Sequence, residues 1–155
     1  MKVIFLDIDG VLNCSKSKSS CLGCTGIDDI KVKRLKRIIE NTNAKIILIS
    51  SWKEEWYKEF CNKCLQDEFA NYLDRKLKKQ GLAIFDKSVD NFCSRGKGIL
   101  KVLSKYSVGK FIILDDEVFD YKELNLFPFL VKTDYYNGGL TEELAQIAID
   151  KLNKG

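Results

Sequence analysis

The chain has 155 residues, enough for one domain with a proper core and too few for two ordinary domains. Hydrophobic residues make up 45% of it and charged residues 31%, a balance that excludes an intrinsically disordered protein. The formal net charge of +4 permits a polyanionic partner without requiring one, and the absence of histidine excludes Ser-His-Asp triads, HExxH zinc sites and an imidazole general base.

Hydrophobic periodicity predicts strands and helices in alternation. In chain order the expected elements are a strand at Val3–Leu6, a helix at Asp28–Thr42, a strand at Ile46–Ile49, helices at Trp52–Leu65 and Gln66–Lys79, a strand at Leu82–Phe85, a helix at Gly96–Tyr106, strands at Phe111–Leu114 and Phe129–Val131, and a helix at Thr141–Leu152. The last of these helices opens with a Thr-Glu-Glu cap pattern, Thr141–Glu143. The strands show little polar alternation, which is typical of a parallel sheet covered by helices on both faces. We therefore expect a three-layer α/β fold, formed as a single domain by residues 1–155.

The segments between these elements add three expectations. The longest irregular stretch is 13–26, directly after the first strand, where α/β sheets place their ligands. Pro128 precedes the last predicted strand, which favours an edge position because a missing N–H is tolerated there. No apolar run is long enough to span a bilayer and the N-terminus enters a strand, so we expect a cytoplasmic protein without membrane contact.

Acidic residues follow two of the predicted strands. Asp7 and Asp9 come after the first strand, whereas Asp115 and Asp116 come after the fourth, with Asp120 shortly beyond. If these parallel strands are neighbours, their carboxyl ends bring the acids to one edge of the sheet. Clustered carboxylates repel one another unless a cation is present, and oxygen ligands suit Mg²⁺. The alternative, that each pair is only a helix cap or turn, is less favoured because both pairs follow a solid apolar strand.

Two further sites carry groups that suit phosphate. The strand ending at Ile49 is followed by the hydroxyl side chains of Ser50 and Ser51, and a predicted helix begins near Arg95 and Lys97. Hydroxyl groups, cations and the free N–H groups of a helix N-terminus all bind phosphate oxygens. The sequence thus supplies ligands for a metal and for a phosphate.

In their order and placement, these features resemble the four motifs of haloacid-dehalogenase (HAD) superfamily phosphatases. The matching features are D-I-D-G-V at Asp7–Val11, the strand-terminal Ser50, a basic residue ahead of a helix, and D-D-x-x-x-D at Asp115–Asp120. More narrowly, FLDIDGVLN, ILISSWK, RGKGI, FIILDDE and GGLTEE resemble the HAD domain of Swiss-army-knife RNA repair proteins. The resemblance covers nearly the whole chain and implies a Rossmann-like HAD fold with a minimal cap.

The resemblance also implies roles for the acids. Asp7 would be the nucleophile that forms an aspartyl-phosphate, and Asp9 the general acid and then the general base. Asp7, Asp116 and the backbone carbonyl of Asp9 would bind Mg²⁺. Asp115 and Asp120 would hold the metal site from beside or behind.

The remaining motif residues would bind the phosphate. Gly10 would let the backbone N–H groups face the phosphoryl oxygens, and Ser50, with Ser51 beside it, would donate to one of them. In many family members the basic residue lies four positions before an apolar helix residue. Arg95 has this relation to Ile99, so it is favoured as the phosphate-binding cation, with Lys97 as the alternative.

The sequence therefore favours a Mg²⁺-dependent phosphomonoester hydrolase with an aspartyl-phosphate intermediate. The minimal cap leaves the site open, which favours an accessible phosphate on a large substrate, such as a nucleic-acid end, over a small metabolite that needs full enclosure. Nucleotide or nucleic-acid-end phosphates are therefore the expected substrate class. The rival hypothesis is a non-catalytic HAD-like module that binds phosphate or protein, with a structural zinc ion joining two of its segments as an optional feature. The oligomeric state and the substrate are not specified by the sequence.

Two C-x-x-C pairs, Cys21/Cys24 and Cys61/Cys64, have three explanations: a structural zinc site, a redox site or ordinary thiols. Four thiolates would bind a structural zinc ion, yet a cytosolic chain and a helical position for the second pair favour ordinary reduced thiols, with a redox role less favoured.

Basic and aromatic side chains have two explanations as well. Basic residues occur along two predicted helices and form either a solvated face or a binding surface for a nucleic-acid backbone: Lys31, Lys33, Arg34, Lys36, Arg37, Arg75, Lys76, Lys78 and Lys79. Trp52, Trp56 and Tyr57 either fill the core, which is favoured, or stack on a base.

Overall fold

In the part of the chain that the structure describes, five parallel strands form the central sheet, as the apolar runs predicted. The computed structural model describes residues 1–91 and 93–155. The strand order is β5-β4-β1-β6-β7, and every pairing in this sheet is parallel. The strands span Lys2–Leu6 (β1), Lys45–Leu48 (β4), Ile84–Lys87 (β5), Lys110–Asp115 (β6) and Leu130–Lys132 (β7). Strands far apart in sequence thus lie beside β1 at the centre of the sheet.

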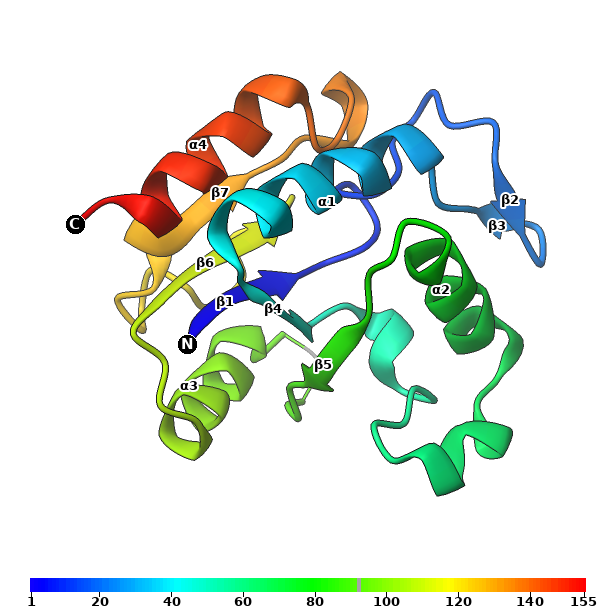
Figure 1. Cartoon of the computed structure of the whole chain (residues 1–155), viewed down its shortest axis with the longest axis horizontal. Coiled ribbons are helices and arrows are strands. Elements are labelled where there is room, and N and C mark those ends of the chain that lie inside the picture. The colour runs from blue at the N-terminus through cyan, green and yellow to red at the C-terminus, as the bar shows by residue number, and fades with distance from the viewer. Residues whose placement is uncertain (92) are drawn as a thin grey trace.

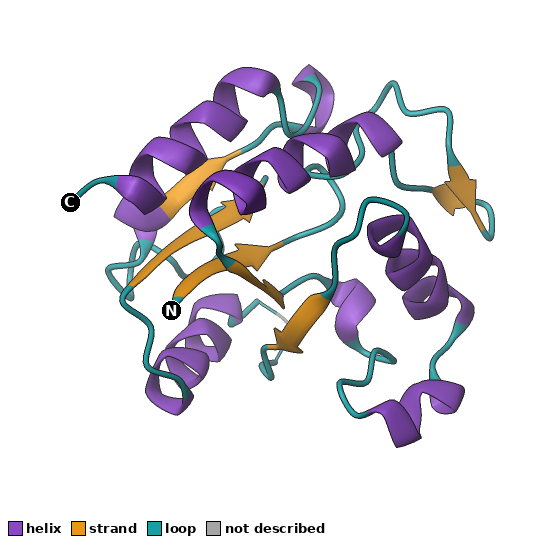
Figure 2. Cartoon of the chain, viewed as in Figure 1, coloured by secondary structure: helices purple, strands orange, loops and turns teal. Residues whose placement is uncertain are grey.

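Over residues 1–91 and 93–155, four α-helices surround the sheet: Asp29–Thr42 (α1), Glu68–Lys78 (α2), Arg95–Lys105 (α3) and Glu142–Asn153 (α4). Helices α1 and α4 lie side by side over one face, α3 covers the other, and α2 lies beyond the β5 edge (Figure 1). Coloured by element type, the strands form a middle layer between helices, and a small hairpin stands apart from it (Figure 2). The expected three-layer α/β architecture is confirmed.

The strands are solidly apolar because both of their faces are buried. Along β1, Ile4 and Leu6 belong to the core that packs on α1 and α4. Val3 and Phe5, which point to the opposite face, belong to the core that packs on α3. This two-sided burial fixes the register of the strand ends, which the acidic residues follow.

Local signals at the helix and strand ends are also confirmed. The Thr141 hydroxyl caps α4 by accepting from the backbone N–H of Leu144 at 3.2 Å. Pro128 lies in a short 3₁₀ helix, Phe127–Phe129, directly before β7, and β7 is an edge strand as expected. Helix α2 is shorter at its start than predicted because Asp67 caps it, accepting from Ala70 N at 2.8 Å.

The predicted helix over Trp52–Leu65 is wrong. This segment contains two 3₁₀ turns, η1 (Ser51–Lys53) and η2 (Phe60–Leu65), joined by irregular chain. Lys87 of β5 donates from Nζ to the carbonyl oxygens of Lys53 at 2.8 Å and Glu54 at 3.2 Å. The Lys53 carbonyl also accepts from Trp56 N at 3.0 Å, an i,i+3 bond, so the segment follows short 3₁₀ turns while its carbonyls bind the Lys87 side chain of β5.

The irregular stretch 13–26 contains an unpredicted hairpin. Its strands are Ser20–Cys21 (β2) and Cys24–Thr25 (β3), paired antiparallel. The two turn residues, Leu22 and Gly23, both have positive φ angles, of 50° and 78°. This turn geometry matches the twist of a tight hairpin, although leucine is an unusual residue for it. Within the described residues, no helix is both long and apolar enough to cross a bilayer.

Candidate active site

The ends of β1 and β6 bring three carboxylates together. Leu6 and Leu114 are paired in the sheet, and Asp7 N donates to Leu114 O at 2.9 Å. One carboxylate oxygen from each of Asp7, Asp115 and Asp116 lies within 4.8 Å of the others. Asp7 and Asp115 are buried, and Asp116 is half-buried. The predicted convergence of the two acidic pairs at one edge of the sheet is therefore confirmed for these three residues.

A single guanidinium contacts two of the acids. Arg95 is the first residue of α3, and its Nη1 lies 2.8 Å from Asp115 Oδ2 and 3.3 Å from Asp7 Oδ1. The guanidinium also lies over the ring of Phe119, 4.2 Å from its centroid. Lys97 is exposed. Of the two basic residues considered from sequence, Arg95 is the one that the fold places among the acids.

The acidic group carries more negative charge than Arg95 offsets. Burial raises the pKa of Asp7 well above its usual value, and the charge of Asp115 adds to this rise. Burial and the neighbouring Asp115 also raise the pKa of Asp116, to about 6. Burial alone would lower the pKa of Arg95, but the charges of Asp7 and Asp115 raise it overall, so the guanidinium stays protonated. An additional cation would restore the balance.

A hard divalent cation fits this donor set. The ligands are three carboxylates, partly shielded from water, and oxygen ligands of this kind are those that Mg²⁺ prefers. Within residues 1–91 and 93–155 no other group of three or more metal-ligating side chains is present. The carboxylates available to a Mg²⁺ ion here are therefore those of Asp7, Asp115 and Asp116.

Asp120 and Tyr121 support the group from the loop after β6. Asp120 Oδ1 accepts from the backbone N–H of Gly96 at 2.7 Å, which fixes the start of α3 and with it Arg95. Its Oδ2 is buried without a hydrogen-bond partner. The Tyr121 hydroxyl donates to Asp115 Oδ2 at 2.7 Å. Asp120 thus lies outside the group of three acids.

The Asp9 carboxylate is not part of the group of three acids. Its Oδ1 accepts from Asn13 Nδ2 at 2.9 Å, and its Oδ2 accepts from the indole Nε1 of Trp52 at 3.0 Å. The Asn13 side chain in turn accepts from Gly10 N at 2.9 Å. Both carboxylate oxygens are thereby held in one orientation. The sequence carried no signal for this role of Asn13 or Trp52, because both act through contacts that only the fold creates.

Gly10 is required by its backbone and by its neighbour. Its φ angle is 82°, and a Cβ atom placed there would lie 2.1 Å from Asp116 Oδ2. The carbonyl of Gly10 accepts from the Thr133 hydroxyl at 2.6 Å. This glycine therefore allows the loop after β1 to approach the acid after β6.

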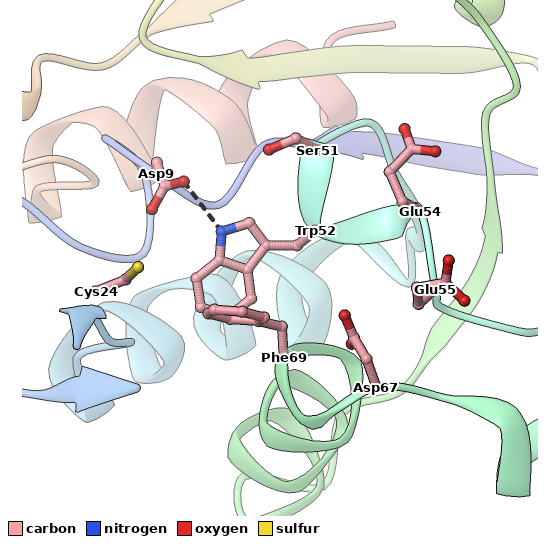
Figure 3. Close-up of a pocket in the computed structure, with 8 residues that line it drawn as sticks. All are labelled: Asp9, Cys24, Ser51, Trp52, Glu54, Glu55, Asp67 and Phe69. Carbon is pink, nitrogen blue, oxygen red and sulfur yellow. Dashed lines mark hydrogen bonds between the residues drawn. The ribbon is translucent and has the colours of Figure 1, made fainter. Parts of the chain in front are cut away.

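Ser50 is buried at the end of β4, whereas Ser51 is exposed. The Ser50 Oγ accepts from Trp52 N at 3.2 Å and so caps the turn η1. Ser51 lines two adjacent pockets. The smaller, of about 80 Å³, reaches Arg95 and Phe119, and the larger, of about 250 Å³, reaches Asp9 and Trp52 (Figure 3).

Lys53 is a buried cation that the sequence analysis missed. Its Nζ donates to Ser88 Oγ at 3.0 Å and to Asp90 Oδ2 at 2.8 Å, and its side chain is 5% exposed. It lines the smaller pocket together with Arg95. Its position three residues after the strand-terminal Ser50 is the one signal that would have pointed to it.

The comparisons agree with this geometry. A family model described as "HAD domain in Swiss Army Knife RNA repair proteins" matches residues 3–145. The chain belongs to this family. Neither a curated protein nor a solved structure matches it significantly. For a HAD domain, the end of β1 and the end of β6 are the expected positions of the first and last acidic motifs, and both are occupied as the sequence analysis proposed.

The other ligand hypotheses receive less support. Cys21, Cys24, Cys61 and Cys64 are unbonded thiols, and among the described residues they form no four-cysteine cluster for zinc.

Many of the basic side chains on α1 and α2 form ion pairs, including Lys31 with Asp28 and Arg34 with Glu142. The solvated-face explanation therefore accounts for much of this charge. Trp56 is buried, as the favoured explanation predicted, but Trp52 reaches Asp9.

Proposed function

We propose that this HAD domain, acting as one unit over residues 1–155, is a Mg²⁺-dependent phosphomonoester hydrolase that works through an aspartyl-phosphate. The observation that carries the proposal is the convergence of Asp7, Asp115 and Asp116, with Arg95 in contact with Asp7 and Asp115. A nucleophile, a cation for phosphoryl oxygens and a metal-binding set of acids lie together there. The acid Asp9 is held separately, two residues from the nucleophile.

In the first step, a carboxylate oxygen of Asp7 attacks phosphorus in line with the leaving oxygen. The new Asp7–phosphorus bond forms as the bond from phosphorus to the leaving oxygen breaks. Asp9 donates its proton to that oxygen, so the product leaves as an alcohol. Arg95 neutralises charge on the phosphoryl oxygens, and the Ser50 hydroxyl donates to one of them. Lys97, which is exposed, remains the alternative cation.

In the second step, Asp9 accepts a proton from water, whose oxygen attacks phosphorus. The bond between Asp7 and phosphorus breaks, inorganic phosphate leaves and the Asp7 carboxylate is restored. A Mg²⁺ ion held by Asp7, Asp116 and the Asp9 carbonyl, with Asp115 and Asp120 beside it, would supply charge neutralisation for the attacking and phosphoryl oxygens. Burial and the charge of Asp115 raise the pKa of Asp7, and this supports the proposal because a nearby cation would stabilise the charged nucleophile.

The substrate class in this proposal is a nucleotide or a nucleic-acid end, which agrees with the RNA-repair name of the family. The non-catalytic module is the competing hypothesis. It requires none of the acids to be essential for a reaction, and it leaves unexplained why Asp9 is oriented by two separate donors.

Hydrolysis of 4-nitrophenyl phosphate tests the proposal. We expect activity with Mg²⁺, loss of activity with a chelator, and loss of activity in Asp7→Asn. Glu123→Gln, a charge removal at an exposed position, serves as the matched control and should retain activity. If the purified protein is inactive toward this ester and toward phosphorylated nucleotides and oligonucleotides, the binding-module hypothesis replaces the proposal.

A further inference from the structure

The larger pocket lies on the leaving-group side of the proposed reaction. A general acid must approach the leaving oxygen to about 2.6–3.2 Å, and Asp9 lines this pocket. Arg95, which contacts the nucleophile, lines the smaller pocket instead. The two pockets share Ser51 and Glu54, so the phosphoryl side and the leaving-group side adjoin.

Aromatic rings form one wall of the larger pocket. Trp52 and Phe69 line it, with ring centroids 5.4 Å apart and an interplanar angle of 76° (Figure 3). Both side chains are half-buried, so each also presents surface to the pocket. The volume of about 250 Å³ is below the roughly 300–1,000 Å³ of pockets that enclose drug-sized ligands. It suits one planar ring system with its sugar, and it is too small for an extended polymer.

The rim of this pocket is negatively charged. Glu54, Glu55 and Asp67 line it with exposed carboxylates, and its eight described lining residues include no lysine or arginine. Such a rim repels a second phosphate on the same molecule. Carboxylates also accept hydrogen bonds from the amino and imino groups of nucleobases. Polarity and shape therefore select the same kind of ligand.

We propose that this pocket binds the leaving group of the substrate, and that the leaving group is a single nucleoside-like planar ring, neutral or positively charged, without a further phosphate. The leaving-group role rests on the proposed phosphatase function, whereas the ring preference rests on the pocket alone. The preferred substrate is then a nucleoside monophosphate rather than the end of an oligonucleotide. This narrows the substrate class that the family name suggests.

Tryptophan fluorescence tests the pocket without catalysis. The chain has two tryptophans, and Trp56 is 2% exposed, so Trp52 is the one that a ligand in solution can reach. Three planar probes of matched size differ in charge: 1-methylnicotinamide is cationic, nicotinamide neutral and nicotinate anionic. We expect saturable quenching in that order of affinity, with the cation binding about tenfold more tightly than the anion at low salt.

The double variant Glu54→Gln/Glu55→Gln removes two of the exposed charges and should reduce this charge preference to about threefold or less. Asp67 is left unchanged because it caps α2. Glu40→Gln/Glu143→Gln is the matched control, since both residues are exposed glutamates outside the pocket lining. Equal affinity for all three probes, or a preference that survives in Glu54→Gln/Glu55→Gln, would overturn the inference and leave the phosphatase proposal intact.

Kinetics test the leaving-group role. The kcat/KM for a nucleoside monophosphate should exceed that for the same nucleotide carrying one additional phosphodiester by about tenfold, and the double variant should narrow the gap. A preference for the longer substrate overturns the inference. If neither substrate is hydrolysed but the three probes still quench fluorescence in the expected order of affinity, the phosphatase function and the leaving-group role are both overturned. The proposal that the pocket binds a planar ring is then retained.

Discussion

Two sets of carboxylates lie close together in this protein, and their surroundings differ. At the strand ends, Asp7 and Asp115 are buried and are paired with Arg95. In the adjoining pocket, Glu54 and Glu55 are exposed. A buried acid requires a nearby cation, because water cannot stabilise its charge, whereas an exposed acid does not. The buried acids therefore need a positive charge held beside them. The exposed acids only weakly attract cationic ligands and repel anionic ones, because water and salt screen their charge.

The largest expected difference between the two sets is in catalysis. Asp7→Asn should lower kcat by roughly 10⁴-fold or more, because the nucleophile is lost. The same change should leave the thermal midpoint unchanged or raise it, since burial and Asp115 make the charged form of Asp7 unfavourable. Steady-state kinetics and thermal unfolding of one preparation check both results. Retained activity would show that the reaction does not use this carboxylate.

Removing the buried cation should affect stability next most strongly. Arg95→Met leaves Asp115 buried without its ion-pair partner, and breaking such a pair costs about 3–5 kcal/mol in the free energy of unfolding. Denaturant unfolding measures this loss. Lys97→Met, at an exposed position in the same helix, is the control and should change stability by about 0.5 kcal/mol or less. Similar losses in the two variants would contradict the assignment of Arg95.

Magnesium should stabilise the buried set. At a concentration one hundred times its dissociation constant, Mg²⁺ should add about 2.7 kcal/mol to the free energy of unfolding. The gain should shrink as the pH falls through about 6, where protonation of Asp116, whose pKa is raised to about 6, competes with the metal. Thermal unfolding with and without Mg²⁺ provides the measurement.

Asp116→Asn should lose most of this stabilisation, and Glu54→Gln/Glu55→Gln should retain it. If the pocket variant loses the magnesium effect instead, the metal lies among the exposed acids and the comparison between the two sets fails.

The smallest expected effect concerns the hydrogen bond that joins the two regions. Trp52→Phe preserves an aromatic ring beside Phe69 but removes the N–H that donates to Asp9. Loss of one hydrogen bond to a charged group should lower kcat by about tenfold. The effect should be smaller for 4-nitrophenyl phosphate, whose leaving group needs little protonation, than for an alkyl phosphate. An equal loss for both esters would indicate general disruption rather than misplacement of Asp9.

The sequence predicted the cluster of acids at the strand ends because its determinants are local. Solid apolar runs identified the central strands, and their carboxyl ends placed Asp7 and Asp115 at one edge. The cap at Thr141 and the edge position of β7 after Pro128 were predicted for the same reason. In each case a short pattern carries enough physical information to fix a position in the fold.

The pocket was not predicted, because its determinants are distant contacts. The helix expected over Trp52–Leu65 ends early where Lys87, more than thirty residues away, bonds to its carbonyls. The burial of Lys53 against Ser88 and Asp90 likewise depends on β5 and the loop after it. Lysine in a helix-like pattern normally predicts a solvated face, and only the tertiary structure reverses that expectation.

The central claim is that Asp7 accepts the phosphoryl group at a site that it forms with Asp115, Asp116 and Arg95. Trapping the phosphorylated intermediate tests this claim most directly. In Asp9→Asn, 4-nitrophenyl phosphate should still react, because its leaving group needs little protonation, whereas hydrolysis of the intermediate slows. Rapid acid quenching and peptide mass spectrometry should then find about one phosphoryl group per chain, on Asp7 and only with Mg²⁺ present. Turnover without a phosphorylated Asp7, or a phosphoryl group on another residue, would contradict the account.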